Sequence, residues 1–357
     1  MDIIVLLQQA VLNHASDIFV VAGLPVSYRA NGRICREKEE KLMPPQTKEC
    51  VEELYKLAGG RDIRVLEEKG DDDFSFAVPG LSRFRVSAYK QRGALSAVIR
   101  VITFELPEPN EIGIPDPVMS FYNLSKGLVL VTGPAGSGKS TTLACLVDKI
   151  NHSMEKHIIT LEDPIEYLHR HQYSMVNQRE IGSDSNDYAQ ALRAALREDP
   201  DVILVGEMRD LETISTALTA AETGHLVLST LHTIGADKTI DRIIDVFPPN
   251  QQQQVRIQLA SVLECIISQQ LIRREDGRGR VAALEVLFAN TAIRNMIREN
   301  KTYQIISTMQ TGKRQGMQTM DDAIYELFLR GDISADSAVS YAQKPGEMSG
   351  KVNFDMP

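Results

Sequence analysis

Residues 127–141 read GLVLVTGPAGSGKST, an apolar run followed by a glycine-rich loop and a helix-forming segment. The loop fits the pattern G-x4-G-K-[ST], in which consecutive backbone N–H groups wrap a phosphate at the start of a helix. Its lysine carries positive charge to the β- and γ-phosphates, and the next hydroxyl ligates Mg²⁺. The pattern therefore predicts a P-loop that binds ATP and Mg²⁺. Its nucleotide-binding residues are Gly133, Pro134, Ala135, Gly136, Ser137, Gly138, Lys139, Ser140 and Thr141.

Length and charge limit the class of protein. A chain of 357 residues with 43% apolar residues is globular and long enough for two or three domains. A net charge of −9 argues against nucleic acid as a partner, because phosphate contacts need a basic surface. No apolar run reaches the ~18 residues of a membrane span, and the N-terminus lacks signal-peptide features. We therefore expect a cytoplasmic protein without a direct membrane span.

Proline spacing divides the chain. Residues 103–117, TFELPEPNEIGIPDP, hold four prolines and no amphipathic period, which indicates a linker. Upstream, residues 3–12 are expected to be helical. Residues 73–101 alternate apolar and polar side chains around two glycine turns, as half-buried antiparallel strands do. This predicts a small α+β domain.

Downstream of the linker, apolar strands alternate with helical segments, which predicts a mainly parallel sheet covered on both faces. From Gln251 onward the pattern becomes mostly helical. The chain is thus an α/β protein in this interpretation. Its expected parts are an N-terminal domain over 1–102, a linker over 103–117, a nucleotide-binding core over 118–270 and a mostly helical region over 271–357.

A second motif, DPDVILVGEMRD, spans residues 199–210. Its β-branched run brings Glu207 to the carboxyl end of a buried strand, beside the nucleotide loop of such a sheet. An acid at this place orients Mg²⁺ or its water shell. The alternative is a surface carboxylate past a strand end.

A third motif, HIITLEDPIEY, spans residues 157–167 and offers Glu162, Asp163 and Glu166 after a strand. A carboxylate here can orient or deprotonate the water that attacks a γ-phosphate. The alternative is helix capping, with Asp163 as the N-cap and Glu166 completing a capping box. Capping by Asp163 does not exclude its contact with a metal ion.

The fourth motif, HLVLSTLHT, spans residues 225–233. His232 follows a buried strand, where an imidazole can bond to a phosphate oxygen and respond to the γ-phosphate. His225 can do the same from the other end of the strand. The alternative for either histidine is a structural role.

These four motifs, in this order and spacing, resemble the Walker A, Asp box, Walker B and His box of secretion-superfamily hexameric ATPases. The segments SRFRVSAYKQRG, DKTIDRIIDVFP, AIRNMIRENK and TGKRQGMQTMD resemble the type IV pilus twitching-motility ATPases over nearly the whole chain. The resemblance implies an N-terminal PAS-like domain, a RecA-like P-loop NTPase core and a ring of six subunits. It implies ATP hydrolysis that powers pilus retraction, at the cytoplasmic face of the inner membrane, through a pilus platform protein.

The resemblance also implies residue roles. Glu166 matches the catalytic carboxylate of the Asp box, Glu207 the Walker B glutamate and His232 the His-box histidine, which act beside Lys139. Arg85 and Arg100 match arginines that approach the nucleotide from the N-terminal domain. The expected metal ligands are Ser140, Asp163 and Glu207.

For Arg85 and for residues 292–299, the residue pattern fits the expected role but also fits a purely structural one. Arg85 alternates with Phe84 and Val86, so it points away from the apolar face, although a merely solvated strand face gives the same pattern. Residues 292–299, AIRNMIRE, place three apolar side chains on one helical face and two arginines on another. We expect this helix to bind the pilus machinery; the alternative is an ordinary amphipathic helix.

Other functions share the nucleotide motifs. Pilus-assembly and type II secretion ATPases typically carry a tetracysteine zinc site and extra N-terminal domains, whereas the four cysteines here never fall at C-x2-C spacing. A RecA-like DNA translocase is opposed by the acidic charge. A non-hydrolysing scaffold is opposed by the presence of both acids and Lys139.

Overall fold

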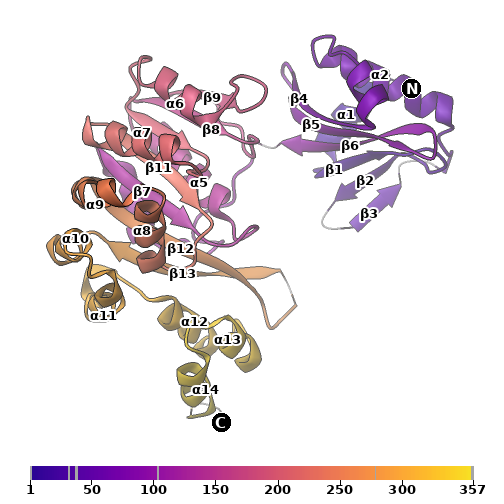
Figure 1. Cartoon of the computed structure of the whole chain (residues 1–357). Helices are drawn as coiled ribbons and strands as arrows, with labels where there is room; N and C mark the ends of the chain where they lie inside the picture. The colour runs from indigo at the N-terminus through magenta and orange to yellow at the C-terminus, as the bar shows by residue number, and fades with distance from the viewer. Residues whose placement is uncertain (1, 31–32, 37–38, 103, 278, 355–357) are drawn as a thin grey trace. The chain divides into compact units, whose positions relative to one another are not determined.

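The computed structural model describes residues 2–30, 33–36, 39–102, 104–277 and 279–354 (Figure 1). The chain forms two compact units. The first comprises Met1–Glu105 with Ile165–Leu168, and the second comprises Leu106–Pro164 and His169–Pro357. The division after Glu105 falls in the proline-rich segment, whose first residue, Thr103, lies outside the described residues.

The first unit is an antiparallel sheet with strand order β3-β2-β1-β6-β5-β4 and three helices. The strands are β1 (Asp17–Val20), β2 (Ser27–Ala30), β3 (Arg33–Arg36), β4 (Asp71–Val78), β5 (Ser82–Gln91) and β6 (Ala94–Ile102). The helices are α1 (Ile3–Leu12), α2 (Pro44–Leu57) and α3 (Arg64–Lys69). Apolar side chains at alternate strand positions pack with all three helices into one core, as the period-two pattern predicted.

The second unit contains a seven-stranded sheet with order β13-β12-β7-β11-β10-β8-β9. Its strands are β7 (Gly127–Thr132), β8 (His157–Glu162), β9 (Met175–Glu180), β10 (Val202–Val205), β11 (Leu226–Leu231), β12 (Leu263–Arg273) and β13 (Arg280–Phe288). All neighbours are parallel except β12 and β13, which form an antiparallel hairpin. The prediction of a mostly helical pattern after Gln251 missed these last two strands.

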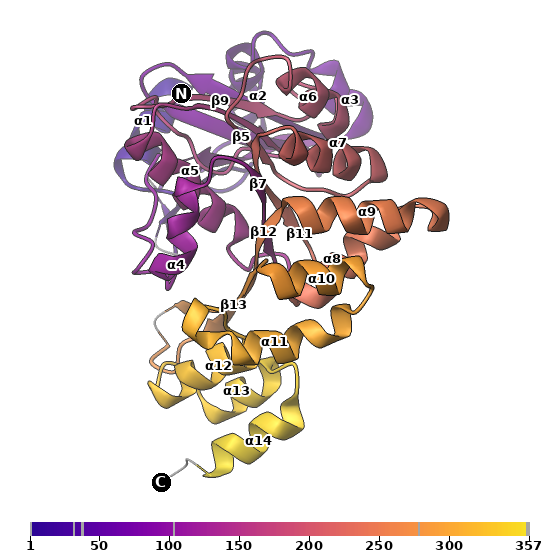
Figure 2. The same cartoon turned by 90° about the vertical axis from the view of Figure 1, so that its left-hand side faces the viewer.

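Helices cover both faces of this sheet, as predicted, and Figure 2 shows α5 and α7 on opposite sides of β7. One face carries α4 (Asp116–Met119), a 3₁₀ turn η1 (Ser120–Asn123) and α5 (Lys139–Ser153). The other carries α6 (Tyr188–Ala195), α7 (Leu211–Glu222), α8 (Ala236–Asp245), α9 (Pro249–Val262), α10 (Thr291–Arg298) and α11 (Ile305–Thr311). The parallel strands are buried on both sides and so read as continuous apolar runs.

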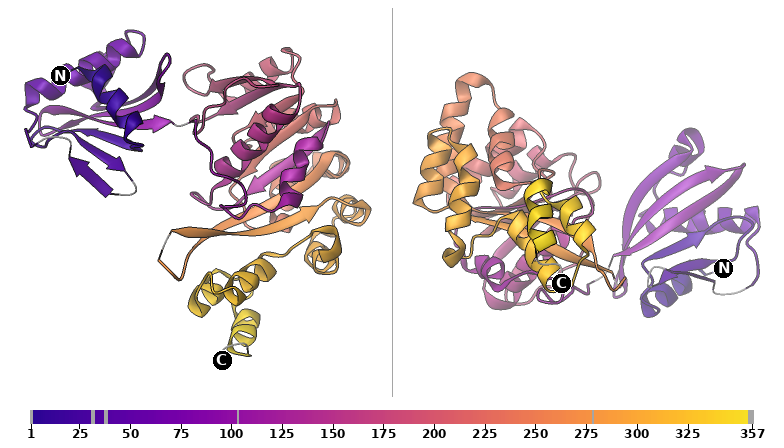
Figure 3. Two further views of the ribbon diagram at one scale, coloured as in Figure 1. Left: turned by 180° about the vertical axis from the view of Figure 1, so that it is seen from behind. Right: turned by 90° about the horizontal axis from the view of Figure 1, so that it is seen from below.

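The chain ends in a small helical cluster that packs on the β12–β13 hairpin (Figure 3). It consists of α12 (Met320–Leu329), α13 (Ala335–Tyr341) and α14 (Pro345–Phe354). Buried Ile272 of β12 and Ala283 of β13 form the sheet side of this core. Among the described residues, no helix has both the length and the apolar character that crossing a bilayer requires.

Candidate active site

The P-loop is a strand–loop–helix unit, as predicted. β7 ends at Thr132 and α5 begins at Lys139, with Gly138 as its N-cap in the left-handed region. Gly133 has φ +142°, and a Cβ there would lie 2.2 Å from the Gln269 carbonyl oxygen, so only glycine fits. Gln269 of β12 also accepts a hydrogen bond from the Thr142 hydroxyl at 2.8 Å. Strand β12 thus supports the loop and the first turn of α5 from behind.

Lys139 is buried and turned into its own loop. Its Nζ donates to the carbonyl oxygens of Gly133 and Pro134, both at 3.0 Å. The same Nζ lies 3.4 Å from Nδ1 of His232, which follows β11. The loop backbone and His232 therefore hold the ammonium within the P-loop.

Glu207 lies at the carboxyl end of β10, and its carboxylate contacts the side chains of Arg209 and His232. Oε2 is 2.7 Å from the Arg209 guanidinium and 3.3 Å from Nε2 of His232. Burial alone would raise the pKa of Glu207, but Arg209 and His232 outweigh it and hold this pKa below its usual range. A neutral imidazole with its proton on Nε2 satisfies both His232 contacts, since it donates to Glu207 and accepts from Lys139. Lys139, His232, Glu207 and Arg209 therefore form one continuous polar chain.

The three acids of the Asp box have different surroundings. Oε1 of Glu162 accepts from the Thr160 hydroxyl at 2.6 Å and from Gln178 at 3.2 Å, so Glu162 is held by the sheet. Asp163 is exposed, and its charge acts on Arg209. Glu166 is exposed and lies in the short segment that belongs to the first unit. The capping alternative for Asp163 and Glu166 is wrong, because no helix begins after Pro164 in this described part of the chain.

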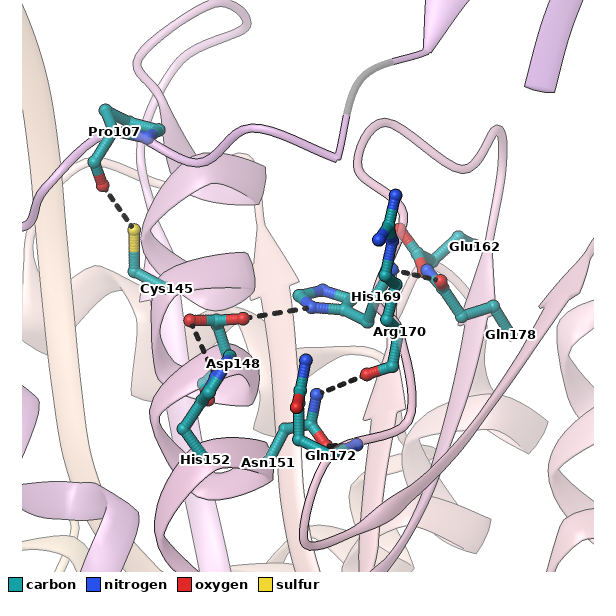
Figure 4. Close-up of polar contacts among 10 residues, drawn as sticks. All are labelled: Pro107, Cys145, Asp148, Asn151, His152, Glu162, His169, Arg170, Gln172 and Gln178. Carbon is teal, nitrogen blue, oxygen red and sulfur yellow. Dashed lines mark hydrogen bonds and ion pairs between the residues drawn. The ribbon is translucent and has the colours of Figure 1, made fainter. Parts of the chain in front are cut away.

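The loop that follows the Asp box is tied to α5 (Figure 4). Buried Asn151 donates to the carbonyl oxygen of Arg170 at 2.7 Å and accepts from the backbone N–H of Gln172 at 3.1 Å. Gln178 accepts from the backbone N–H of His169 at 2.8 Å. One helix therefore carries the P-loop lysine at its start and the anchor of the Asp-box loop near its end.

Tyr188, the first residue of α6, also lies at the site. A Cβ on Gly206 would lie 2.7 Å from its hydroxyl oxygen, so the ring packs against the strand end that carries Glu207. Burial, followed by the charges of Asp163 and Glu207, raises the pKa of Tyr188. The phenol is therefore neutral and positioned among the site carboxylates.

Arg85 and Arg100 both belong to the first unit, where they face each other on β5 and β6. Nε of Arg100 donates to Oδ1 of buried Asp17 at 3.0 Å. Arg85 is half-buried between the buried positions Phe84 and Val86, so the predicted alternation of faces is confirmed.

The structure also bears on the expectations for His225 and for residues 292–299. His225 lies at the amino end of β11, where its Nδ1 contacts the Ala220 carbonyl oxygen at 2.9 Å, so it has a local role far from the strand's carboxyl end. In α10, Ile293 and Ile297 are fully buried, and Arg294 pairs with Glu264 of β12 at 2.9 Å. The apolar face of residues 292–299 is therefore core, and the interpretation as an ordinary amphipathic helix is right for this face.

Sequence reasoning missed Gln269, Arg209 and Tyr188. A usable signal existed for the first two: Gln269 interrupts the apolar run LECIISQQLIR, and Arg209 lies two residues after the Walker B glutamate. Tyr188 follows Asp187, the N-cap of α6, and has no motif of its own. Only the packing of α6 on β8 and β10 brings it to the site.

The fold and the site together define a P-loop ATPase, and the comparisons with known proteins agree. The family model described as type II/IV secretion system protein matches residues 2–338, and the chain belongs to this family. A type IV pilus retraction ATPase, PilT, of Pseudomonas aeruginosa is 47% identical over 97% of this chain and 99% of its own length. A twitching motility protein of Neisseria gonorrhoeae is 50% identical over 80% of this chain and 76% of its own.

A solved structure gives the same result. The crystal structure of a pilus retraction motor, PilT, with bound ADP superposes with a TM-score of 0.87 at 49% identity, covering 97% of this chain and 98% of that one. Within its family, this chain is a PilT-like type IV pilus retraction ATPase.

Proposed function

We propose that the chain is an ATP-hydrolysing motor that works as a homo-hexameric ring and powers type IV pilus retraction. It would act at the cytoplasmic face of the inner membrane through a pilus platform protein. In this proposal the first unit is PAS-like and the second is RecA-like. The observation that supports it most is the polar chain from Lys139 through His232 to Glu207, with contacts of 3.3–3.4 Å.

The P-loop residues and Lys139 would bind the β- and γ-phosphates of ATP. Lys139 needs only to exchange the two loop carbonyl oxygens it now contacts for phosphate oxygens. His232 would report the γ-phosphate, because a phosphate that draws Lys139 away also changes the partner of its Nδ1. Glu207 would respond through Nε2 of the same ring.

Mg²⁺ fits the oxygen donors at this place. The Ser140 hydroxyl lies in the first turn of α5, and Glu207 and exposed Asp163 supply carboxylates, which are ligands that Mg²⁺ prefers. Bound there, the ion would neutralise charge on the phosphate oxygens. Glu166 would orient or deprotonate the attacking water, and Arg85 and Arg100 would approach the nucleotide from the first unit.

Substitution of Glu207 tests this proposal. Glu207→Gln keeps the side-chain shape but removes the charge that organises Arg209 and His232. We expect ATP binding within a few-fold of the parent and hydrolysis lower by about 10²- to 10⁴-fold. Glu275→Gln, on an exposed residue after β12, is the matched control and should behave as the parent. Equal turnover in Glu207→Gln and Glu275→Gln would contradict the assignment.

A further inference from the structure

A pocket of about 450 Å³ lies within the second unit, beside the end of the polar chain. Glu207 and Arg209 after β10, His232 and Thr233 after β11, and Arg242 of α8 contribute to its wall. His232 belongs to both places: its Nδ1 is 3.4 Å from the P-loop lysine, and its ring lines the pocket. One imidazole therefore lies between the P-loop lysine and this cavity.

The charges of the pocket wall suit an anion. Its only carboxylate, among the described lining residues, is Glu207, and that group is already paired with Arg209 and His232. Arg242 is exposed and has no ion pair within the part of the chain that the structure describes. The guanidinium of Arg242 is thus held in no ion pair by the described residues, and it borders a space large enough for a tetrahedral oxyanion.

We propose that this pocket binds inorganic phosphate, the second product of hydrolysis, after it leaves the P-loop. Arginine suits this ligand, because its planar guanidinium donates two parallel hydrogen bonds to phosphate oxygens. Arg242 is the main partner, and Arg209 joins it when the phosphate displaces the Glu207 carboxylate from its guanidinium. The inference rests on the hydrolysis proposed above, and it states where the phosphate product of that reaction binds.

The test measures phosphate binding directly, with radiolabelled inorganic phosphate in equilibrium dialysis against the full chain at constant ionic strength. Arg242→Gln should weaken binding by about tenfold, the loss of one charge-assisted contact. Arg330→Gln is the matched control, since Arg330 is an exposed arginine on α12 that pairs with Glu326, and should bind phosphate as the parent does. Unchanged unfolding temperatures would show that both variants fold.

A second variant separates the pocket from the P-loop. Lys139→Ala removes the cation of the P-loop and should retain phosphate binding, whereas it should lose ATP binding. Loss of phosphate binding in Lys139→Ala together with parental binding in Arg242→Gln would place the phosphate in the P-loop and overturn the proposal. Parental phosphate binding by Arg242→Gln alone would also overturn it.

Steady-state kinetics test whether phosphate bound in this pocket affects ATP hydrolysis. Added phosphate should inhibit ATP hydrolysis by Arg242→Gln about tenfold less than the parent, while inhibition by ADP stays the same. If Arg242→Gln instead dissociates the ring and leaves phosphate binding intact, the arginine holds a carboxylate of a second copy and the proposal is wrong. A parent that hydrolyses ATP without binding phosphate refutes the pocket and leaves the proposed function standing. A parent that does not hydrolyse ATP refutes the proposed function, and the inference falls with it, because the phosphate is then not a product of this chain.

Discussion

At the scale of single residues, we expect substitutions of the two Asp-box glutamates, Glu162 and Glu166, to have different effects. Glu162 is held by Thr160 and Gln178, whereas Glu166 is exposed. Glu166→Gln should lower turnover by about 10²-fold or more, as the loss of a water-orienting carboxylate does. Glu162→Gln should reduce stability, because it weakens the hydrogen bonds from Thr160 and Gln178, with less than a tenfold effect on turnover. Steady-state ATPase assays and thermal unfolding of both variants measure this contrast. Turnover within threefold of the parent in Glu166→Gln would refute its catalytic assignment.

Asp72 gives a pH prediction in the first unit. Burial would raise its pKa, but hydrogen bonds from Arg61 and Tyr55 outweigh burial and lower it. A lowered carboxyl pKa adds stability above the unfolded pKa of about 3.9, and this is lost as pH falls through the folded value. Asp72→Asn should therefore cost about 1–3 kcal/mol at neutral pH and much less near pH 3. Urea unfolding at both pH values measures the difference, and a cost that does not shrink on acidification would contradict the account.

At the scale of elements, sequence patterns correctly predicted those strands and loops whose residues lie close together in the chain. β7 and its loop are complete within fifteen residues, and β7 (Gly127–Thr132) coincides with the apolar run that precedes the glycine-rich loop. β12 and β13 were missed because buried Ser268, Gln269 and Glu285 interrupt their apolar runs. Those polar groups have partners only in the folded chain: Glu285 accepts from the N–H of Ala236, at the start of α8. Because Glu285 and Ala236 lie far apart in the sequence, a local sequence pattern could not predict this hydrogen bond.

The alternative of a capped helix after Pro164 is wrong for a related reason. Residues 169–174 are held by Asn151 of α5 and by Gln178 of β9, so contacts distant in sequence determine their conformation. A local capping pattern stabilises a helix less than several such hydrogen bonds stabilise the observed loop. The positions of the P-loop, Glu207 and His232 were predictable because each follows a buried strand of one parallel sheet, where the carboxyl ends meet.

The burial of the apolar face of α10 leads to a stability prediction. Ile293→Asn puts an amide into a fully buried position and should cost about 2–5 kcal/mol, with loss of ring assembly and ATP hydrolysis together. The control is Ala292→Asn, at an exposed neighbour, which should stay within about 0.5 kcal/mol of the parent. Chemical unfolding and ATPase activity measure both. A variant at Ile293 that keeps full stability and ATPase activity but fails in retraction would restore the earlier interpretation of this face.

At the scale of the whole molecule, the proposed ring makes activity depend on assembly. Arg85 and Arg100 lie in the first unit, and arginines that neutralise transition-state charge are worth about 10³-fold or more. If a neighbouring subunit completes the site, specific activity should rise steeply with protein concentration as rings form. Arg85→Gln should lower the plateau and leave assembly unchanged. Constant specific activity from monomer to ring, measured with light scattering alongside, would count against shared sites.

The central claim is that hydrolysis at the Lys139–His232–Glu207 site drives pilus retraction. The most direct measurement replaces the chain in its own cells with Glu207→Gln at parental abundance and follows labelled pili by fluorescence microscopy. The account predicts that these cells extend pili, fail to retract them and lose twitching motility, while cells with Glu275→Gln retract normally. Retraction at the parental rate in Glu207→Gln cells, with ATP hydrolysis of the purified variant abolished, would contradict it.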